Sequence, residues 1–103
     1  MTGAARVDDH SPMITSVQWQ STTASLSGTG AILRQIVIPA GTIAARHHHD
    51  KEQFLFVASG GGTLQCEAGA IVLAPGVALH LPAGDWHSAA FDVGTVLIEL
   101  NLT

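Results

Sequence analysis

The chain has 103 residues, of which 47 % are hydrophobic and 12 % are charged, and its formal net charge at pH 7 is −4. This length supports one domain with one core, which excludes a two-domain enzyme whose active site lies between lobes, and the hydrophobic content excludes an intrinsically disordered chain. With four Lys and Arg against eight Asp and Glu, the chain offers no basic surface for nucleic acid, and we expect no such partner.

Residues 1–15 are polar and carry no periodicity, so we expect a flexible N-terminal arm before a single domain at residues 16–103. From there Gly and Pro punctuate short runs rich in Ile, Val, Leu, Thr and Phe. The runs are Ala31–Ile38, Gln53–Ala58, Thr63–Glu67, Ala70–Leu73, Val77–Leu81, Ser88–Phe91 and Thr95–Leu102. Short strands separated by regular turns are typical of an all-β sandwich or barrel, and no run has the spacing of a substantial helix.

Three consecutive histidines follow a strand pattern at positions 47–49. Side chains alternate between the two faces of a strand, so we predict that His47 and His49 share one face and that His48 points away. Gln53 follows a charged turn, and the turn before His87 can return that residue to the same place. Together these four side chains offer three imidazoles and one amide oxygen, a set suited to Zn²⁺, Fe²⁺, Ni²⁺ or Mn²⁺.

The spacing of these residues resembles the first motif of the cupin superfamily. That motif runs Gly, five residues, His, one residue, His, three or four residues, Glu, six residues, Gly. Gly41, His47, His49 and Gly60 match it, with Gln53 at the position of the usual Glu. Glu52 does not fit the count, because it leaves two residues after His49 and seven before Gly60.

The second cupin motif runs Gly, five residues, Pro, one residue, Gly, two residues, His, three residues, Asn. Gly76, Pro82, Gly84 and His87 match it, and Phe91 occupies the position of the usual Asn. Fifteen residues separate the two motifs, a spacing that resembles that of microbial single-domain cupins. The resemblance covers roughly residues 31–100 and implies an all-β double-stranded β-helix, the cupin or jelly-roll barrel.

The same resemblance implies that His47, His49, Gln53 and His87 bind one divalent metal ion. Gln at the acidic position resembles a minority of cupins that includes pectin-breakdown enzymes acting on unsaturated uronates and some polyketide cyclases. Gln leaves the full charge on the ion, which favours Lewis-acid chemistry and disfavours an oxidised trivalent state. We therefore expect isomerase, cyclase or lyase chemistry on a small carbonyl or carboxylate compound. A mononuclear metal dioxygenase and a non-enzymatic small-ligand-binding cupin are the alternatives.

Two further residues are candidates for a catalytic role. Arg34 and Gln35 are adjacent in one predicted strand, so one of them faces inward, and an inward Arg34 could bind a substrate carboxylate. Glu99 alternates with Ile98 and Leu100 and is either a surface residue or a carboxylate near the metal that acts as a general base. The sequence also leaves open whether His80 faces inward or outward, and an exposed or interface position is favoured. Phe54 and Phe56, opposite in parity to Gln53, belong either to the core or to a dimer interface.

Cys66 is the single cysteine and cannot form an internal disulfide, which is typical of a reducing compartment. No apolar run approaches the roughly 18 residues of a membrane span, and residues 1–12 lack the apolar region of a signal peptide. We therefore expect a cytoplasmic protein without membrane contact. The low charge content favours a homodimer.

Overall fold

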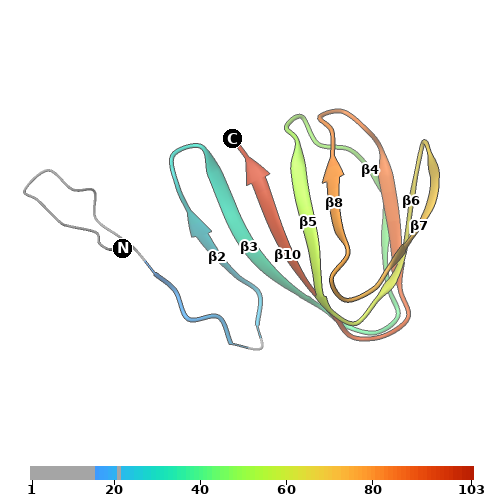
Figure 1. Cartoon of the computed structure of the whole chain (residues 1–103), viewed down its shortest axis with the longest axis horizontal. Coiled ribbons are helices and arrows are strands. Elements are labelled where there is room, and N and C mark those ends of the chain that lie inside the picture. The colour runs from blue at the N-terminus through green and yellow to red at the C-terminus, as the bar shows by residue number, and fades with distance from the viewer. Residues whose placement is uncertain (1–15, 21) are drawn as a thin grey trace, which may run out of the picture.

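The computed structural model describes residues 16–20 and 22–103, and the predicted arm at residues 1–15 lies outside these residues. The described residues form strands and no helix, so they contain no helix that could cross a membrane. One sheet has the order β2 (Ala24–Ser27), β3 (Ala31–Ile38), β10 (Thr95–Leu102), β5 (Gln53–Ser59) and β8 (Ala78–Leu81). The other has the order β4 (Thr42–His47), β9 (His87–Phe91), β6 (Gly62–Cys66) and β7 (Gly69–Leu73) (Figure 1).

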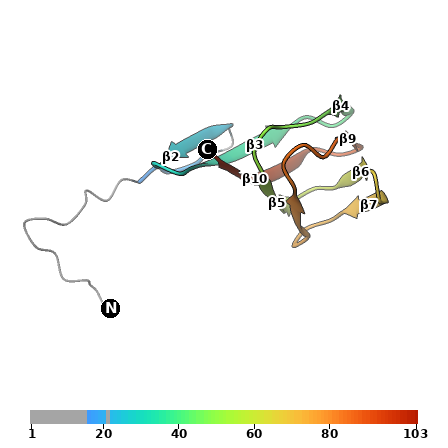
Figure 2. The same cartoon turned by 90° about the horizontal axis from the view of Figure 1, so that it is seen from above.

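All seven predicted strands are present, and β3 and β10 agree with the prediction at both ends. Strand β2 was not among the predicted runs. The prediction placed His47 and His49 in one strand, which is wrong for His49, because β4 ends at His47. In the view from above, β2, β3, β10 and β5 form one group of strands, and β4, β9, β6 and β7 form the other (Figure 2).

Strand β10 lies at the centre of the five-stranded sheet and fixes which residues of its neighbours share a face. It pairs with β3 and with β5, both antiparallel. Glu99 stands opposite Arg34 on one side and Leu55 on the other, and Asn101 stands opposite Gln53. Since Leu55 and Gln53 are buried, Arg34, Glu99 and Asn101 belong to the inner face of this sheet.

The core lies between the two sheets and is made of apolar residues from both. Its buried members are Leu55, Val57, Leu64, Leu73, Leu81, Phe91 and Leu97. At one end of this core the β5–β6 connection packs directly against the β9–β10 connection. A Cβ atom on Gly60 would overlap the carbonyl oxygen of Gly94, so only glycine fits there. The Thr95 hydroxyl accepts a hydrogen bond from the Gly61 amide at 3.0 Å and ties the two connections together.

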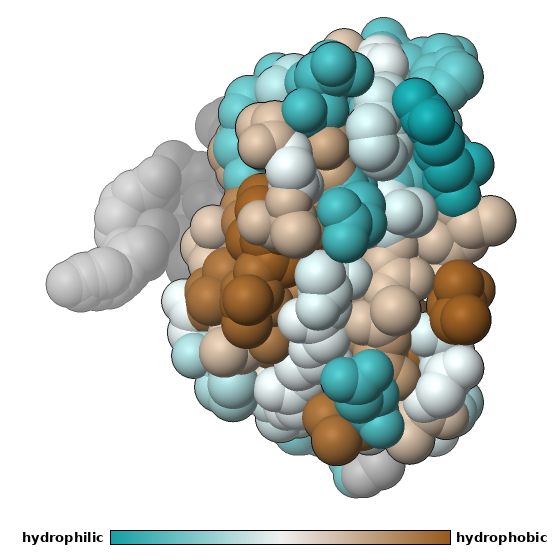
Figure 3. All heavy atoms as spheres, turned by 90° about the vertical axis from the view of Figure 1, so that its right-hand side faces the viewer, coloured by the Kyte–Doolittle hydropathy of each residue, from teal (hydrophilic) through white to brown (hydrophobic). Residues whose placement is uncertain are grey.

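The outer face of the five-stranded sheet carries exposed apolar side chains. Phe54 and Phe56 are 41 % and 45 % exposed, so they lie outside the core. With Leu33, His80 and Ile98 they line a surface hollow of about 380 Å³. A different face, on the right-hand side of Figure 1, shows hydrophobic patches interrupted by hydrophilic residues (Figure 3). The homodimer stays a prediction.

Candidate metal centre

Three imidazoles meet at one end of the barrel. His47 is the last residue of β4, His49 lies in the connection to β5, and His87 is the first residue of β9. One ring nitrogen from each lies within 4.8 Å of the others. The ring centroids are 4.9 Å apart for His47 and His49, 4.3 Å for His47 and His87, and 5.5 Å for His49 and His87. The predicted grouping of these three histidines is therefore present in the fold.

A β-bulge directs His47 into the barrel. Ala44 pairs with Ala89 and His47 pairs with His87, so two residues of β4 stand opposite one residue of β9. In a regular strand, residues three apart point to opposite faces. Because of the bulge, Ala44 and His47 instead line the same cavity. Strand alternation alone would have turned His47 away from His87.

The connection that carries His49 is held by the turn that precedes His87. The amide of Gly84 donates a hydrogen bond of 2.8 Å to the carbonyl oxygen of His49. The turn is closed by the amide of Asp85, which donates to the carbonyl oxygen of Pro82 at 3.2 Å. Gly84 has a φ of 81°, a conformation that disfavours any residue with a side chain. The Pro-Ala-Gly-Asp sequence thus positions two of the three histidines.

The hydrogen bonds of the imidazoles leave nitrogen lone pairs available. Nδ1 of His47 lies 2.7 Å from the carbonyl oxygen of Ala45 in the bulge, and in the neutral ring an N–H donated there leaves the lone pair of Nε2 free. Nδ1 of His87 is buried and has no hydrogen-bond partner among the described residues. A buried nitrogen without a partner is costly unless something binds it. The three imidazoles fit the requirements of a divalent metal ion.

The protonation state of His87 also suits metal binding. Burial of the ring lowers the pKa of His87 below its usual 6.5, and the neighbouring His47 and His49 lower this pKa further. The Asp85 backbone and the negative charge of Glu99 act in the opposite direction and are smaller influences. His87 is therefore held neutral at pH 7, which is the form that binds a metal.

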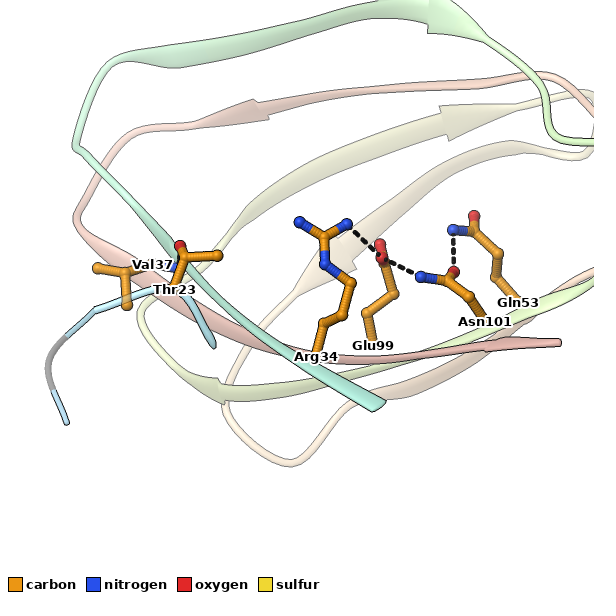
Figure 4. Close-up of polar contacts among 6 residues, drawn as sticks. All are labelled: Thr23, Arg34, Val37, Gln53, Glu99 and Asn101. Carbon is orange, nitrogen blue, oxygen red and sulfur yellow. Dashed lines mark hydrogen bonds and ion pairs between the residues drawn. The ribbon is translucent and has the colours of Figure 1, made fainter. Parts of the chain in front are cut away.

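A chain of hydrogen bonds leads from the fourth predicted ligand, Gln53, to Arg34 (Figure 4). Nε2 of Gln53 donates to Oδ1 of Asn101 at 2.6 Å, and Nδ2 of Asn101 donates to Oε1 of Glu99 at 2.7 Å. The same Glu99 oxygen accepts a hydrogen bond of 3.3 Å from Arg34. Gln53 is 5 % exposed. The sequence left open whether Arg34 and Glu99 face inward or outward, and in the structure both face the space between the sheets.

Two hollows adjoin this chain and the histidines. An interior cavity of about 150 Å³ is bordered by His47, His87 and Glu99, and its remaining lining is apolar. A second hollow, of about 230 Å³, is bordered by His49, Gln53 and Asn101. The carboxylate of Glu99 thus shares a cavity with two of the imidazoles, and Gln53 shares the other hollow with the third.

The remaining candidate residues lie away from the centre. His48 is exposed and does not belong to the histidine group. His80 is on the outer face, where Nε2 lies 3.2 Å from Glu52. Gln35 faces outward and donates to the Gln20 carbonyl oxygen at 2.7 Å. Sequence reasoning did not single out Asn101. Its parity with Glu99 was visible in the sequence, but its position opposite Gln53 follows from the pairing of strands 48 residues apart.

Comparisons with known proteins bear on the family and the fold of the chain. The cupin-domain family model matches residues 34–97, more than half of the chain. No curated protein matches the sequence. Among solved structures, KdgF from Halomonas sp. is 20 % identical with a TM-score of 0.72, over 78 % of this chain and 77 % of that one.

Two further solved structures share the fold. A cupin superfamily protein from Desulfitobacterium hafniense DCB-2 is 15 % identical with a TM-score of 0.69, over 86 % of this chain and 83 % of that one. Salicylate 1,2-dioxygenase from Pseudaminobacter salicylatoxidans is 17 % identical with a TM-score of 0.66, over 70 % of this chain and 21 % of that one. The family match, the two-sheet barrel and the two motifs at their expected places lead to one conclusion: the chain belongs to the cupin family.

Proposed function

We propose that the protein is a metal-dependent cupin enzyme that acts on a small carbonyl or carboxylate compound. The observation that carries the proposal is the convergence of His47, His49 and His87. Two of them, His47 and His87, border a cavity that Glu99 also borders. Gln53 is the fourth ligand in this proposal. A divalent ion bound there would polarise a substrate oxygen as a Lewis acid, and the four neutral ligands would leave its charge uncancelled.

The chain's own residues have distinct roles in this proposal. Glu99 moves a proton at Oε2, the oxygen that its bonds to Arg34 and Asn101 leave unused. Arg34 shares one nitrogen with Glu99 and directs its other N–H donors to a substrate carboxylate. The apolar lining of the interior cavity excludes water from the reacting atoms. The reaction class is isomerisation, cyclisation or elimination that begins with removal of a proton beside a carbonyl.

Metal content and proton exchange test this proposal together. We expect protein purified without chelator to contain one divalent ion per chain, and His49→Ala to contain far less. The control is His48→Ala, because His48 is adjacent but outside the group, and its metal content should equal that of the wild type.

The chemical step is tested with pyruvate in D₂O, followed by NMR. We expect the metal-loaded wild type to exchange the methyl protons of pyruvate and Glu99→Gln to be slower by about 10²-fold or more. Equal rates in both would contradict the role of Glu99. Turnover that requires O₂ would favour the dioxygenase alternative, and binding of pyruvate without exchange would favour a ligand-binding cupin.

A further inference from the structure

The hydrogen-bond chain from Arg34 to Gln53 has a direction that its chemistry fixes. Arg34 carries N–H donors and no acceptor, and an ionised Glu99 carries acceptors and no donor. Asn101 must therefore turn its NH₂ group toward Glu99, which leaves its Oδ1 facing Gln53. That oxygen can only accept, so Gln53 must turn Nε2 toward Asn101 and Oε1 away from it (Figure 4).

We infer that Asn101 is a positioning residue that selects Gln over Glu at position 53 and fixes which end of the amide faces the metal site. The bearing on the metal rests on the proposed function, since a metal ion binds the amide oxygen and not its NH₂ group. The direction of the chain itself needs no metal. It follows from three hydrogen bonds between residues that are buried or partly buried.

A glutamate at position 53 would conflict with this chain. A carboxylate there would place an oxygen against Oδ1 of Asn101, across a contact that is now 2.6 Å. Rotation of the Asn101 amide would relieve that contact and create the same conflict with Oε1 of Glu99, at 2.7 Å. Either arrangement leaves two acceptors facing each other in a site that is 5 % exposed at Gln53. The hydrogen bond to Asn101 therefore accounts for Gln at position 53 in place of the usual cupin Glu.

The test is a double-mutant cycle on chelated, metal-free protein, followed by thermal unfolding. We expect Gln53→Glu to lower the Tm by about 4–8 °C, the shift that about 1 kcal/mol produces in a domain of this size. In an Asn101→Ser background, where a hydroxyl can rotate to donate, we expect the same substitution to lower the Tm by less than half as much.

This cycle separates hydrogen-bond direction from charge repulsion. The double variant carries carboxylates at positions 53 and 99, so the repulsion between them stays the same or grows in the absence of the Asn101 amide. An equal or larger loss of Tm in the Asn101→Ser background would therefore overturn the inference. If Gln53→Glu does not fold, NMR of the wild type decides. Slowly exchanging Gln53 side-chain NH₂ protons with contacts to Asn101 support the inference, and fast-exchanging ones overturn it.

Metal binding then separates this inference from the proposed function. Asn101→Ser should weaken Zn²⁺ binding by about 10–100-fold, as loss of a residue that orients a ligand does, and His48→Ala should leave it unchanged. Coupling in the metal-free cycle together with a wild type that binds no Zn²⁺ would support the inference and contradict the proposed function. Tight Zn²⁺ binding by the wild type with no coupling in the metal-free cycle would support the proposed function and overturn the inference.

Discussion

The interior of the barrel has two halves that differ in chemistry although the same strands build both. Along the inner face of β10, buried Thr95 and Leu97 are followed by Glu99 and Asn101, and along β5, Val57 and Leu55 lead to Gln53. One half is therefore an apolar core, and the other is a set of inward polar side chains that bond to one another. Burial of the apolar side chains stabilises the fold, and this gain offsets the cost of enclosing polar side chains in the other half.

The largest expected effect on folding lies in the apolar half. Leu64 is 1 % exposed, and Leu64→Ala should lower the free energy of unfolding by about 2–5 kcal/mol, because it removes buried surface and leaves a cavity. Ile43→Ala is the control, since Ile43 is 77 % exposed and its loss should cost about 0.5 kcal/mol or less. Urea unfolding of both variants measures the difference. Similar losses in the two would contradict the assignment of the core.

The three histidines beside the polar half should make the stability of the protein depend on metal. Zn²⁺ at about 100 times its Kd should raise the free energy of unfolding of the wild type by about 2.7 kcal/mol, because it binds the folded state alone. His49→Ala should lose most of this gain, and His48→Ala should keep it. Thermal unfolding with and without Zn²⁺ measures it. Loss of the gain in both variants would mean that the histidine run binds metal without the predicted selectivity.

Acidification should weaken the metal-free protein through His87. Its pKa is lowered in the folded state, so the unfolded chain binds the proton more readily, with a pKa of about 6.5. The stability that neutral His87 provides is complete above pH 6.5 and is lost as the pH falls through that value toward the lower folded pKa. Urea unfolding of chelated protein between about pH 8 and pH 5 should show this loss. In His87→Gln the pH dependence should be shallower, and an unchanged slope would contradict the assignment.

The smallest expected effect is a difference between two glycine substitutions that should cost the same stability but differ in their effect on metal binding. Gly84 and Gly41 have φ values of 81° and 85°, and a Cβ on either would meet no atom within 4 Å. Gly84→Ala and Gly41→Ala should therefore cost the same backbone strain, about 1–2 kcal/mol each. Gly84 also donates to the His49 carbonyl oxygen, so its variant alone should weaken Zn²⁺ binding, by about tenfold. Calorimetric titration measures the affinity, and equal affinities in the two variants would contradict the role of the turn.

Much of this architecture follows from local sequence. The Gly and Pro positions delimit β3 and the start of β10, because turns need those residues and strands exclude them. The spacing of His47, His49 and His87 indicates the grouping found at the end of the barrel. The bulge before His47 was not predictable, since Ala45 and Arg46 carry no signal for it. The facing of Arg34 and the role of Asn101 depend on the register between β3, β10 and β5, which no local pattern encodes.

Anomalous diffraction from crystals of the Zn²⁺-loaded protein tests the central claim most directly. We predict one strong anomalous peak per chain, bonded to nitrogen atoms of His47, His49 and His87 at about 2.0–2.1 Å, with Oε1 of Gln53 as the fourth ligand. A peak located elsewhere, or a well-ordered histidine group without a peak in Zn²⁺-loaded crystals, would contradict the claim.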